Sequence, residues 1–461
     1  MLRMRLLPLL SSFLFAAAAT AQLNPGNLVV LRVGDGLNPL SNASQALFLD
    51  EFTTSGSFVQ TIVLPTAASG ANLPIACSGT ATSEGNLQLA ENGQFLVLGG
   101  YGASPGIASI AASSSATTPR VVARIGLDAS VDTSTSISNA FSGNNIRSAT
   151  STNGIDFFAA GANSGLQYLT LGATTSTALN TTLPLNTRTV QIAGGQLYCT
   201  SSSGAFLGVS SVGTGIPTTA GQTITALPGM PTASGPSTYD FFFADANTLY
   251  LADDRTTLGN GGIHKYTLQS GTWTFQYNLN PATTVGCRGL TGVVDNGVVT
   301  LFATNTLNGT NELLTVTDVG PGSPFTTVAT AGVNTVFRGV RLLPATSFIS
   351  RIPHGCGPTS IVPSGTGAIG TTLTTTIGNT TGVPFVGYGF VLFPSPVCAL
   401  CTIGHEWGVV QFGSTSNFGI PNNVAFAGLV VGIQGADLLG SGGCATPGPV
   451  TLTDTLAVTL H

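Results

Sequence analysis

Short apolar runs separated by turn residues recur along most of the 461-residue chain. The clearest group of them lies in segment 239–279, with runs at residues 239–244, 249–252, 263–268 and 272–279. The first gap contains Asp-Ala-Asn and the last contains Ser-Gly, which are residues that favour tight turns. Four antiparallel strands within about 40–50 residues have the size of one β-propeller blade. Because one blade cannot bury both of its faces, the segment predicts further copies along the chain.

Other segments begin in the same way, with a strand, a tight turn such as Asn-Gly or Gly-Gly, and a second strand. Their starts, near residues 84, 147, 188, 240 and 288, are mostly about 40–60 residues apart, which is the blade range. Residues 27–64 supply only three strands, whereas strand 337–344 begins like the other blades and then stops at Pro344.

We therefore predict that strand 337–344 pairs with the N-terminal blade and closes a six-bladed β-propeller over residues 22–345. Closure removes the sheet edges that would otherwise favour aggregation. A seven-bladed propeller is the alternative, because residues 101–145 form a long and irregular stretch.

The character of the chain changes in residues 346–461. Only one Arg, one Glu and two Asp occur there, and short apolar runs alternate with Gly, Pro and Asn. This pattern predicts a second all-β domain, a β-sandwich.

Charged residues make up only 7% of the sequence, against about 25% in an average soluble protein. The net charge is −5, and Lys265 is the only lysine. With so few basic residues, nucleic acid is not an expected partner.

Residues 1–21 have the pattern of a signal peptide. Arg3 and Arg5 precede an apolar core, and Ala-Thr-Ala precedes Gln22. The apolar run is shorter than the roughly 20 residues of a transmembrane helix, and no later segment is long enough to span a membrane. We expect a protein that is secreted, in an extracellular or cell-envelope location, with no transmembrane segment after cleavage.

Export permits disulfides, and the chain has seven cysteines. Four of them lie within about 90 residues near the C-terminus and are the disulfide candidates: Cys356, Cys398, Cys401 and Cys444. Spacing does not choose among their three pairings. A zinc site is the less favoured interpretation of Cys398, Cys401 and His405, so no metal and no cofactor is expected.

Several short motifs resemble a family of secreted bacterial β-propeller proteins that has no established activity. They are GTATSEG (79–85), FSGNNIRS (141–148), YDFFFADANTLYLADDR (239–255) and CRGLTGVV (287–294). The tail, with GCGPTS (355–360) and FGIPNN (418–423), is similar to the C-terminal β-domain of exported planctomycete proteins. These resemblances imply fold and export, and no chemistry.

The candidate binding residues are those that open each expected innermost strand. Superposing the hairpins places six side chains in register: Glu84, Arg147, Arg188, Asp240, Arg288 and Arg338. Innermost strands line the central channel of a propeller, so these residues are expected to surround one end of it. Guanidinium groups bind carboxylates and sulfates in bidentate fashion, which predicts an anionic small molecule or a polysaccharide as ligand. The alternative is that each arginine pairs with a neighbour and staples adjacent blades.

We expect a non-enzymatic binding protein, with no catalytic residue assigned. A hydrolase or lyase acting at the same end of the channel is one alternative. Lactonase-type propellers hold a cation on carboxylates at the channel centre, which four arginines would repel. A structural cell-surface protein is the other alternative.

Overall fold

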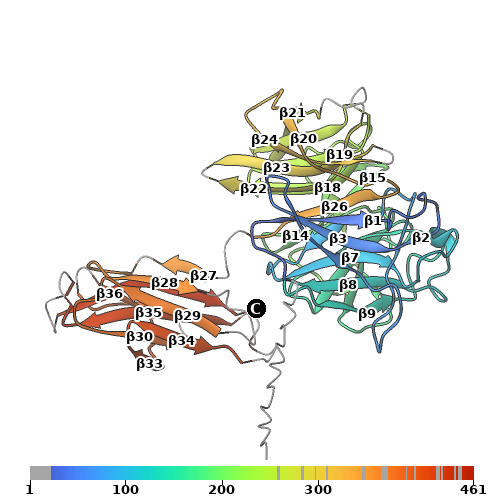
Figure 1. Ribbon diagram of the computed structural model, residues 1–461. Coiled ribbons are helices and arrows are strands. Elements are labelled where there is room, and N and C mark those ends of the chain that lie inside the picture. Colours follow the sequence, from blue (N-terminus) through green and yellow to red (C-terminus); the bar gives the residue numbers. More distant parts are fainter. Residues whose placement is uncertain are drawn as a thin grey trace, which may run out of the picture.

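The computed structural model describes residues 22–460 except 257–259, 282–284, 296, 308–309, 345–348, 353, 365–371, 391, 399–400, 422–425, 427–428, 441–442 and 445–448. The expected signal peptide therefore lies outside the described residues. Within them the regular structure is β-strand, apart from the short 3₁₀ helix η1 (Ile110–Ala112), so the predicted all-β class is confirmed (Figure 1).

Six sheets in the N-terminal part have four strands each, and all are antiparallel. The first sheet has the order β26 (Val336–Leu342), β1 (Leu28–Val33), β3 (Leu47–Phe52), β4 (Phe58–Val63). The second consists of β6 (Leu87–Leu89), β7 (Phe95–Tyr101), β8 (Arg120–Gly126) and β9 (Val131–Ile137). The third consists of β10 (Ile146–Ser151), β11 (Asp156–Gly161), β12 (Gln167–Thr170) and β13 (Thr177–Ala178).

The remaining three four-stranded sheets follow in chain order. The fourth consists of β14 (Val190–Ala193), β15 (Gln196–Ser203), β16 (Phe206–Val212) and β17 (Ile224–Ala226). The fifth consists of β18 (Thr238–Asp245), β19 (Thr248–Asp253), β20 (Gly262–Gln269) and β21 (Thr272–Leu279). The sixth consists of β22 (Cys287–Asp295), β23 (Val298–Asn305), β24 (Glu312–Thr317) and β25 (Phe325–Thr330). A small bridge pairs β2 (Ser44–Gln45) with β5 (Cys77–Ser78).

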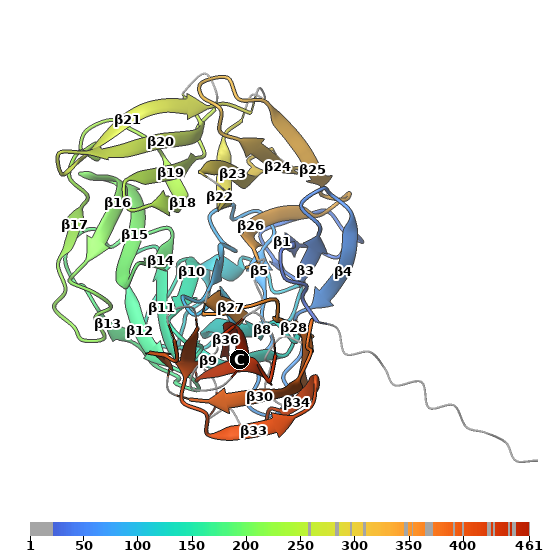
Figure 2. The same ribbon diagram turned by 90° about the vertical axis from the view of Figure 1, so that its left-hand side faces the viewer.

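The six sheets radiate from a common centre, which is the arrangement of a β-propeller (Figure 2). The innermost strands are β26, β6, β10, β14, β18 and β22. Strand β26 pairs antiparallel with β1, with Leu342 opposite Leu28 and Val340 opposite Val30. The first sheet is thus built from both ends of the propeller segment, and the ring is closed by backbone hydrogen bonds. Residues 101–145, which read as irregular in the sequence, contain η1, β8 and β9, and the last two complete the second sheet.

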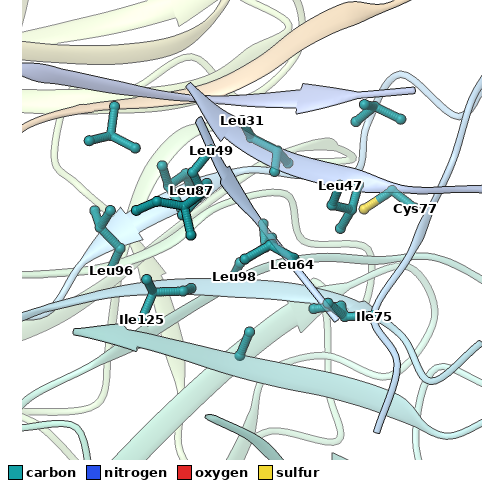
Figure 3. Packing of buried hydrophobic residues seen from close by; sticks show 14 of the residues in the cluster. Leu31, Leu47, Leu49, Leu64, Ile75, Cys77, Leu87, Leu96, Leu98 and Ile125 are labelled. Carbon is teal, nitrogen blue, oxygen red and sulfur yellow. The ribbon is translucent and has the colours of Figure 1, made fainter. Parts of the chain in front are cut away.

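Buried aliphatic side chains fill the space between neighbouring sheets. Between the first and second sheets, Leu31 and Leu49 pack with Leu96, Leu98 and Ile125 (Figure 3). Each of these five side chains is fully buried. Alternate residues of each strand face one neighbouring sheet, so every sheet contributes to two cores.

Turn chemistry sets the register of the fifth sheet. The backbone N–H of Asn247 donates to Asp245 Oδ1 at 2.7 Å, which makes the turn between β18 and β19. Ser270 and Gly271 have φ of 49° and 79°, as a two-residue hairpin between β20 and β21 requires. Both turns lie where the sequence predicts them.

The C-terminal part contains a five-stranded and a three-stranded sheet that share one core. The first has the order β27 (Ile349–Ile352), β36 (Val450–Thr459), β35 (Val430–Leu438), β30 (Val383–Gly389), β33 (Val409–Phe412). The second consists of β28 (Ser360–Ser364), β29 (Thr372–Gly378) and β34 (Thr415–Gly419), and a separate hairpin pairs β31 (Leu392–Pro396) with β32 (Thr402–His405). Ile361, Leu373 and Ile377 of the smaller sheet pack with Ile433 and Leu456 of the larger one.

Candidate functional site

A β-bulge interrupts the beginning of the innermost strand in four of the six sheets. In β10 the extra residue is Arg147, between the paired residues on either side. In β22 Arg288 and Gly289 together face one residue of β23, and in β26 Arg338 and Gly339 together face one residue of β1. The two glycines lie where a side chain would clash with the backbone of the next innermost strand. Because bulges re-aim side chains, these positions direct arginines toward the end of the channel, which we call the mouth.

The bulge in β18 consists of Tyr239 and Asp240. Tyr239 therefore takes the position that Arg288 and Arg338 have in their strands. The sequence superposition assigns that position to Asp240, one residue later. Asp240 takes the position of the glycines, and its side chain is fully buried. Its carboxylate thus lies inside the channel, away from the mouth where the superposition expects it.

Inside the channel, Asp240 forms an ion pair with Arg341 of β26. Arg341 Nη1 is 2.8 Å from Asp240 Oδ2, and Nη2 is 3.1 Å from Oδ1. Nη1 also donates to the carbonyls of Leu290 and Val340, both at 2.7 Å. The pair is almost inaccessible to solvent, with side chains 5% and 0% exposed.

Arg338 and Glu84 are stapling residues. The guanidinium of Arg338 is buried and donates to the carbonyls of Ser78, Gly79, Ala81 and Glu84, in the segment that leads into the second blade. Glu84 accepts hydrogen bonds from Tyr101 Oη at 2.5 Å, Asn145 Nδ2 at 2.5 Å and the Ser78 N–H at 2.7 Å. Burial raises the pKa of Glu84, and the hydrogen bond from Tyr101 and the charge of Arg338 oppose that rise.

The other three arginines contact an adjacent blade with only part of each guanidinium. Arg147 Nη1 donates to Asn186 Oδ1 at 2.5 Å and to the Thr187 carbonyl at 2.9 Å. Arg188 Nη1 donates to Ser237 Oγ at 2.9 Å and lies 3.8 Å from Asp254 Oδ1.

Arg288 is the most directly paired of the three. Its Nε and Nη2 donate to Asp254 Oδ2 at 3.3 and 3.1 Å. Within the described chain, five nitrogens of the three guanidiniums keep no hydrogen-bond partner: Nε and Nη2 of Arg147, Nε and Nη2 of Arg188, and Nη1 of Arg288.

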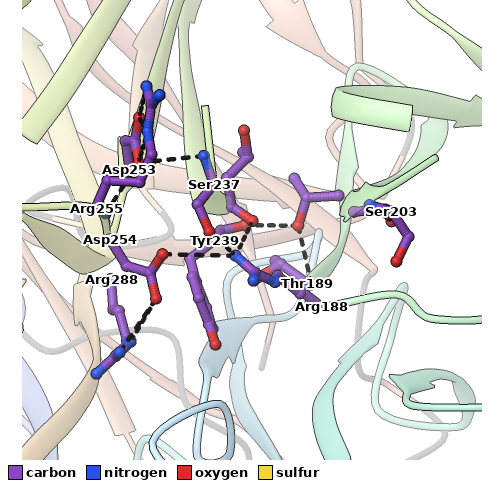
Figure 4. A network of polar contacts seen from close by, with 12 residues as sticks. Arg188, Thr189, Ser203, Ser237, Tyr239, Asp253, Asp254, Arg255 and Arg288 are labelled. Atoms are coloured by element: carbon purple, nitrogen blue, oxygen red, sulfur yellow. Dashed lines mark hydrogen bonds and ion pairs between the residues drawn. The ribbon is translucent and has the colours of Figure 1, made fainter. Parts of the chain in front are cut away.

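Tyr239 lies between the guanidiniums of Arg188 and Arg288 (Figure 4). The Cζ of Arg188 is 4.2 Å and that of Arg288 is 5.3 Å from the centroid of the Tyr239 ring, so both make cation–π contacts. Arg147 is close enough to interact electrostatically with Tyr239 and Arg188. Burial lowers the pKa of its guanidinium from the ordinary high value of an arginine. The Tyr239 hydroxyl makes no hydrogen bond in the described chain. Two of the three arginines, Arg188 and Arg288, thus share one carboxylate, Asp254, and Arg147 has no ion pair in the described chain.

A pocket of about 370 Å³ opens beside this cluster, and we call it the mouth pocket. Its lining includes Glu84, Asn86, Tyr239, Arg288, Asn305, Asn311 and Arg338, with Thr80, Thr82 and Ser83 on one side. The Nε of Arg338 is buried there without a hydrogen-bond partner among the described residues. The wall therefore offers guanidinium nitrogens, hydroxyls and amides, which are groups that bind oxyanions and sugar hydroxyls.

The structure thus divides the six sequence-predicted residues. It brings Arg147, Arg188 and Arg288 together, while Glu84 and Arg338 line the mouth pocket as buried stapling residues, and Asp240 lies in the channel. The superposition misses Tyr239 and Asp254. The sequence did contain a signal for Tyr239, because it directly precedes Asp240 and a bulge shifts the register of a strand by one residue.

The four C-terminal disulfide candidates form two disulfides, Cys356–Cys401 and Cys398–Cys444. The sulfur atoms of Cys356, Cys401 and Cys444 are also the one cluster of three or more metal-ligating side chains among the described residues, and all three belong to the disulfides. The other three cysteines, Cys77, Cys199 and Cys287, are buried free thiols. Burial raises the pKa of Cys199 and of Cys287 to about 12, so neither is a reactive thiolate at neutral pH.

The fold and the mouth define a β-propeller protein with an arginine-lined pocket. No protein-family model and no curated protein matches the chain. One similar solved structure is a candidate 6-phosphogluconolactonase from Bacteroides uniformis, with 13% identity and a TM-score of 0.40, covering 84% of this chain and 99% of that one. Another is the dihydro-heme d1 dehydrogenase NirN, with 12% identity and a TM-score of 0.33, covering 64% of this chain and 56% of that one. Similarities this low transfer no activity to this chain.

Among the described residues no helix has the length and apolar character needed to cross a membrane.

Proposed function

We propose that this chain is a secreted or cell-envelope binding protein that holds an anionic, carboxylated or sulfated sugar in the mouth pocket. In this proposal residues 22–345 are a six-bladed propeller closed by β26, and residues 346–461 are a β-sandwich. The leader-like sequence of residues 1–21 and the two disulfides support export, because disulfides persist in oxidising compartments.

One observation carries the binding proposal: Arg188 and Arg288 share a single carboxylate, Asp254, Arg147 has no ion pair in the described chain, and each of the three keeps an unbonded nitrogen. An arginine that served only as a staple would direct all its donors to the adjacent blade, as Arg338 nearly does. An oxyanion placed among the three groups would accept the remaining donors in charge-assisted hydrogen bonds.

The charge distribution supports the same ligand class. The chain has a net charge of −5, yet positive groups outnumber the carboxylates at the mouth. A local field of opposite sign to the whole molecule concentrates anions at that one place.

The test is a binding screen of acidic and neutral glycans on the protein without residues 1–21. The double variant Arg147→Ala/Arg288→Ala should lose binding, because it removes two of the three guanidiniums. Arg124→Ala is the matched control, since this arginine lies on β8, outside the mouth, and pairs with Asp132 at 3.3 Å. Binding of neutral sugars only, or equal binding by both variants, would refute an anion site at the mouth.

A further inference from the structure

The mouth pocket has a closed floor. Asn86 lines the pocket and belongs to a buried polar network that crosses the channel behind it, which we call the channel plug and which consists of Asn86, Gln88, Ser148, Asp240 and Arg341. All five side chains lie on innermost strands or directly before one, and each residue is at most 7% exposed. We infer that the mouth pocket is blind and that it takes the terminal residue of an acidic saccharide end-on, an inference that rests on the proposed function.

Hydrogen bonds of the plug join all six innermost strands. Gln88 donates to Asn86 Oδ1 and, at 3.5 Å, to Asp240 Oδ1, while Arg341 binds the same carboxylate from β26. Asp240 also accepts the Leu290 N–H of β22 at 3.1 Å. The Ser148 hydroxyl is 3.2 Å from Asn86 Oδ1 and accepts the Val190 N–H of β14 at 3.4 Å. A saccharide chain cannot thread through a channel that is crossed in this way.

A second pocket shows that the two ends of the channel are separate. It has a volume of about 310 Å³ and is lined by residues such as Leu89, Gln191, Phe242, Thr291 and Leu342. It shares no lining residue with the mouth pocket. Arg341 lines this second pocket, whereas Asn86 lines the first, so the plug lies between them.

The size and lining of the mouth pocket match one end of a saccharide. A volume of about 370 Å³ is near the lower limit of the about 300–1,000 Å³ typical of small-molecule pockets. The hydroxyls of Thr80, Thr82 and Ser83 make no hydrogen bonds in the described chain and are available to ring hydroxyls. The oxyanion then meets Arg288, and the rest of the saccharide extends into solvent.

Isothermal titration calorimetry with galacturonic acid, glucuronic acid, trigalacturonic acid, polygalacturonate and galactose 6-sulfate tests this inference. The best hexuronic acid and its trisaccharide should have Kd values within about threefold of each other, because only one residue is bound. Polygalacturonate should bind with a stoichiometry set by chain ends. Chemical modification of one end of the trisaccharide, either reduction of the reducing end or 4,5-unsaturation of the other, should abolish binding. If galactose 6-sulfate binds instead of the uronic acids, the oxyanion is a sulfate, and its 6-sulfated oligosaccharides must then meet the same criteria.

Three results separate the possible failures. An affinity that rises more than about tenfold from mono- to trisaccharide, or a polymer stoichiometry that follows residue number, would overturn the blind pocket while leaving the proposed function intact. Absence of binding by every acidic probe would overturn both. Binding that survives unweakened in Arg288→Ala, with an unchanged melting temperature, would place the ligand elsewhere, because Arg288 lines the mouth pocket.

Discussion

Removing Arg341 should destabilise the propeller strongly, because it leaves a buried charge without its partner. In Arg341→Met the carboxylate of Asp240 keeps the N–H groups of Phe241 at 3.0 Å and Leu290 at 3.1 Å, but it loses both guanidinium contacts. The side chains are 5% and 0% exposed, so water does not replace the lost partner. Breaking such a pair from one side costs about 3–5 kcal/mol.

Differential scanning calorimetry at pH 7 measures this loss as a fall in melting temperature of about 6 °C or more. The double variant Arg341→Met/Asp240→Asn removes both charges at nearly constant volume. It should recover at least about 2 kcal/mol, since a buried ion pair is worth little compared with a neutral replacement of the same shape. A single variant that loses less than about 1 kcal/mol, or a double variant no more stable than the single one, would refute a desolvated pair in the channel.

Three other properties follow from the contacts described. Tyr239→Phe should lower ligand affinity by about tenfold with no change in melting temperature, because the hydroxyl has no partner in the described chain; equal affinity would exclude a contact to ligand. Burial opposes ionisation of Asp318, but hydrogen bonds from Lys265 and two tyrosines lower its pKa from the ordinary value of 3.8. The stability that ionised Asp318 contributes is therefore present above pH 3.8, and it is lost as the pH falls through the lower folded-state pKa. Thermal unfolding should therefore show Asp318→Asn less stable than wild type at pH 7, with the difference shrinking from about pH 5 toward pH 2, whereas a constant difference would contradict the shift. A thiol titration should find no reactive cysteine in the native protein and three after unfolding without reductant. Each disulfide closes a loop of 45 or 46 residues, so reducing either one should lower the free energy of unfolding by about 4 kcal/mol in the chain-entropy model.

The local features of the propeller are predictable from sequence because they depend on neighbouring residues. The Ser270-Gly271 turn adopts the left-handed backbone that such a pair favours, and the strand before Pro344 pairs with the N-terminal blade. Apolar alternation places strands, and turn chemistry places their ends.

The arrangement of side chains at the mouth could not be predicted from the pattern of apolar and turn residues, because it depends on strand register and on contacts between blades. A superposition of strands assumes a constant register, but the bulge in β18 moves Tyr239 into the arginine position and Asp240 into the channel. The partner of Asp240 is 101 residues away, on the strand that closes the ring. Asp254 is likewise 34 residues from Arg288, on the adjoining blade. Such pairs follow only from the closed ring, because sequence spacing does not show which blades are adjacent.

The bulges also have a consequence for how such a protein can change its ligand. A residue inserted at a bulge lies outside the regular ladder of backbone hydrogen bonds, so its side chain is not constrained by a partner across the strand. Arg147, Tyr239, Arg288 and Arg338 all occupy such positions. The residues of the proposed binding site thus occupy positions that the sheets do not need for their own backbone pairing. Substitution of Arg147 or Tyr239 can change the proposed specificity of the mouth without changing the backbone pairing of the sheets, whereas Arg338 also staples the first blade to the segment that follows it.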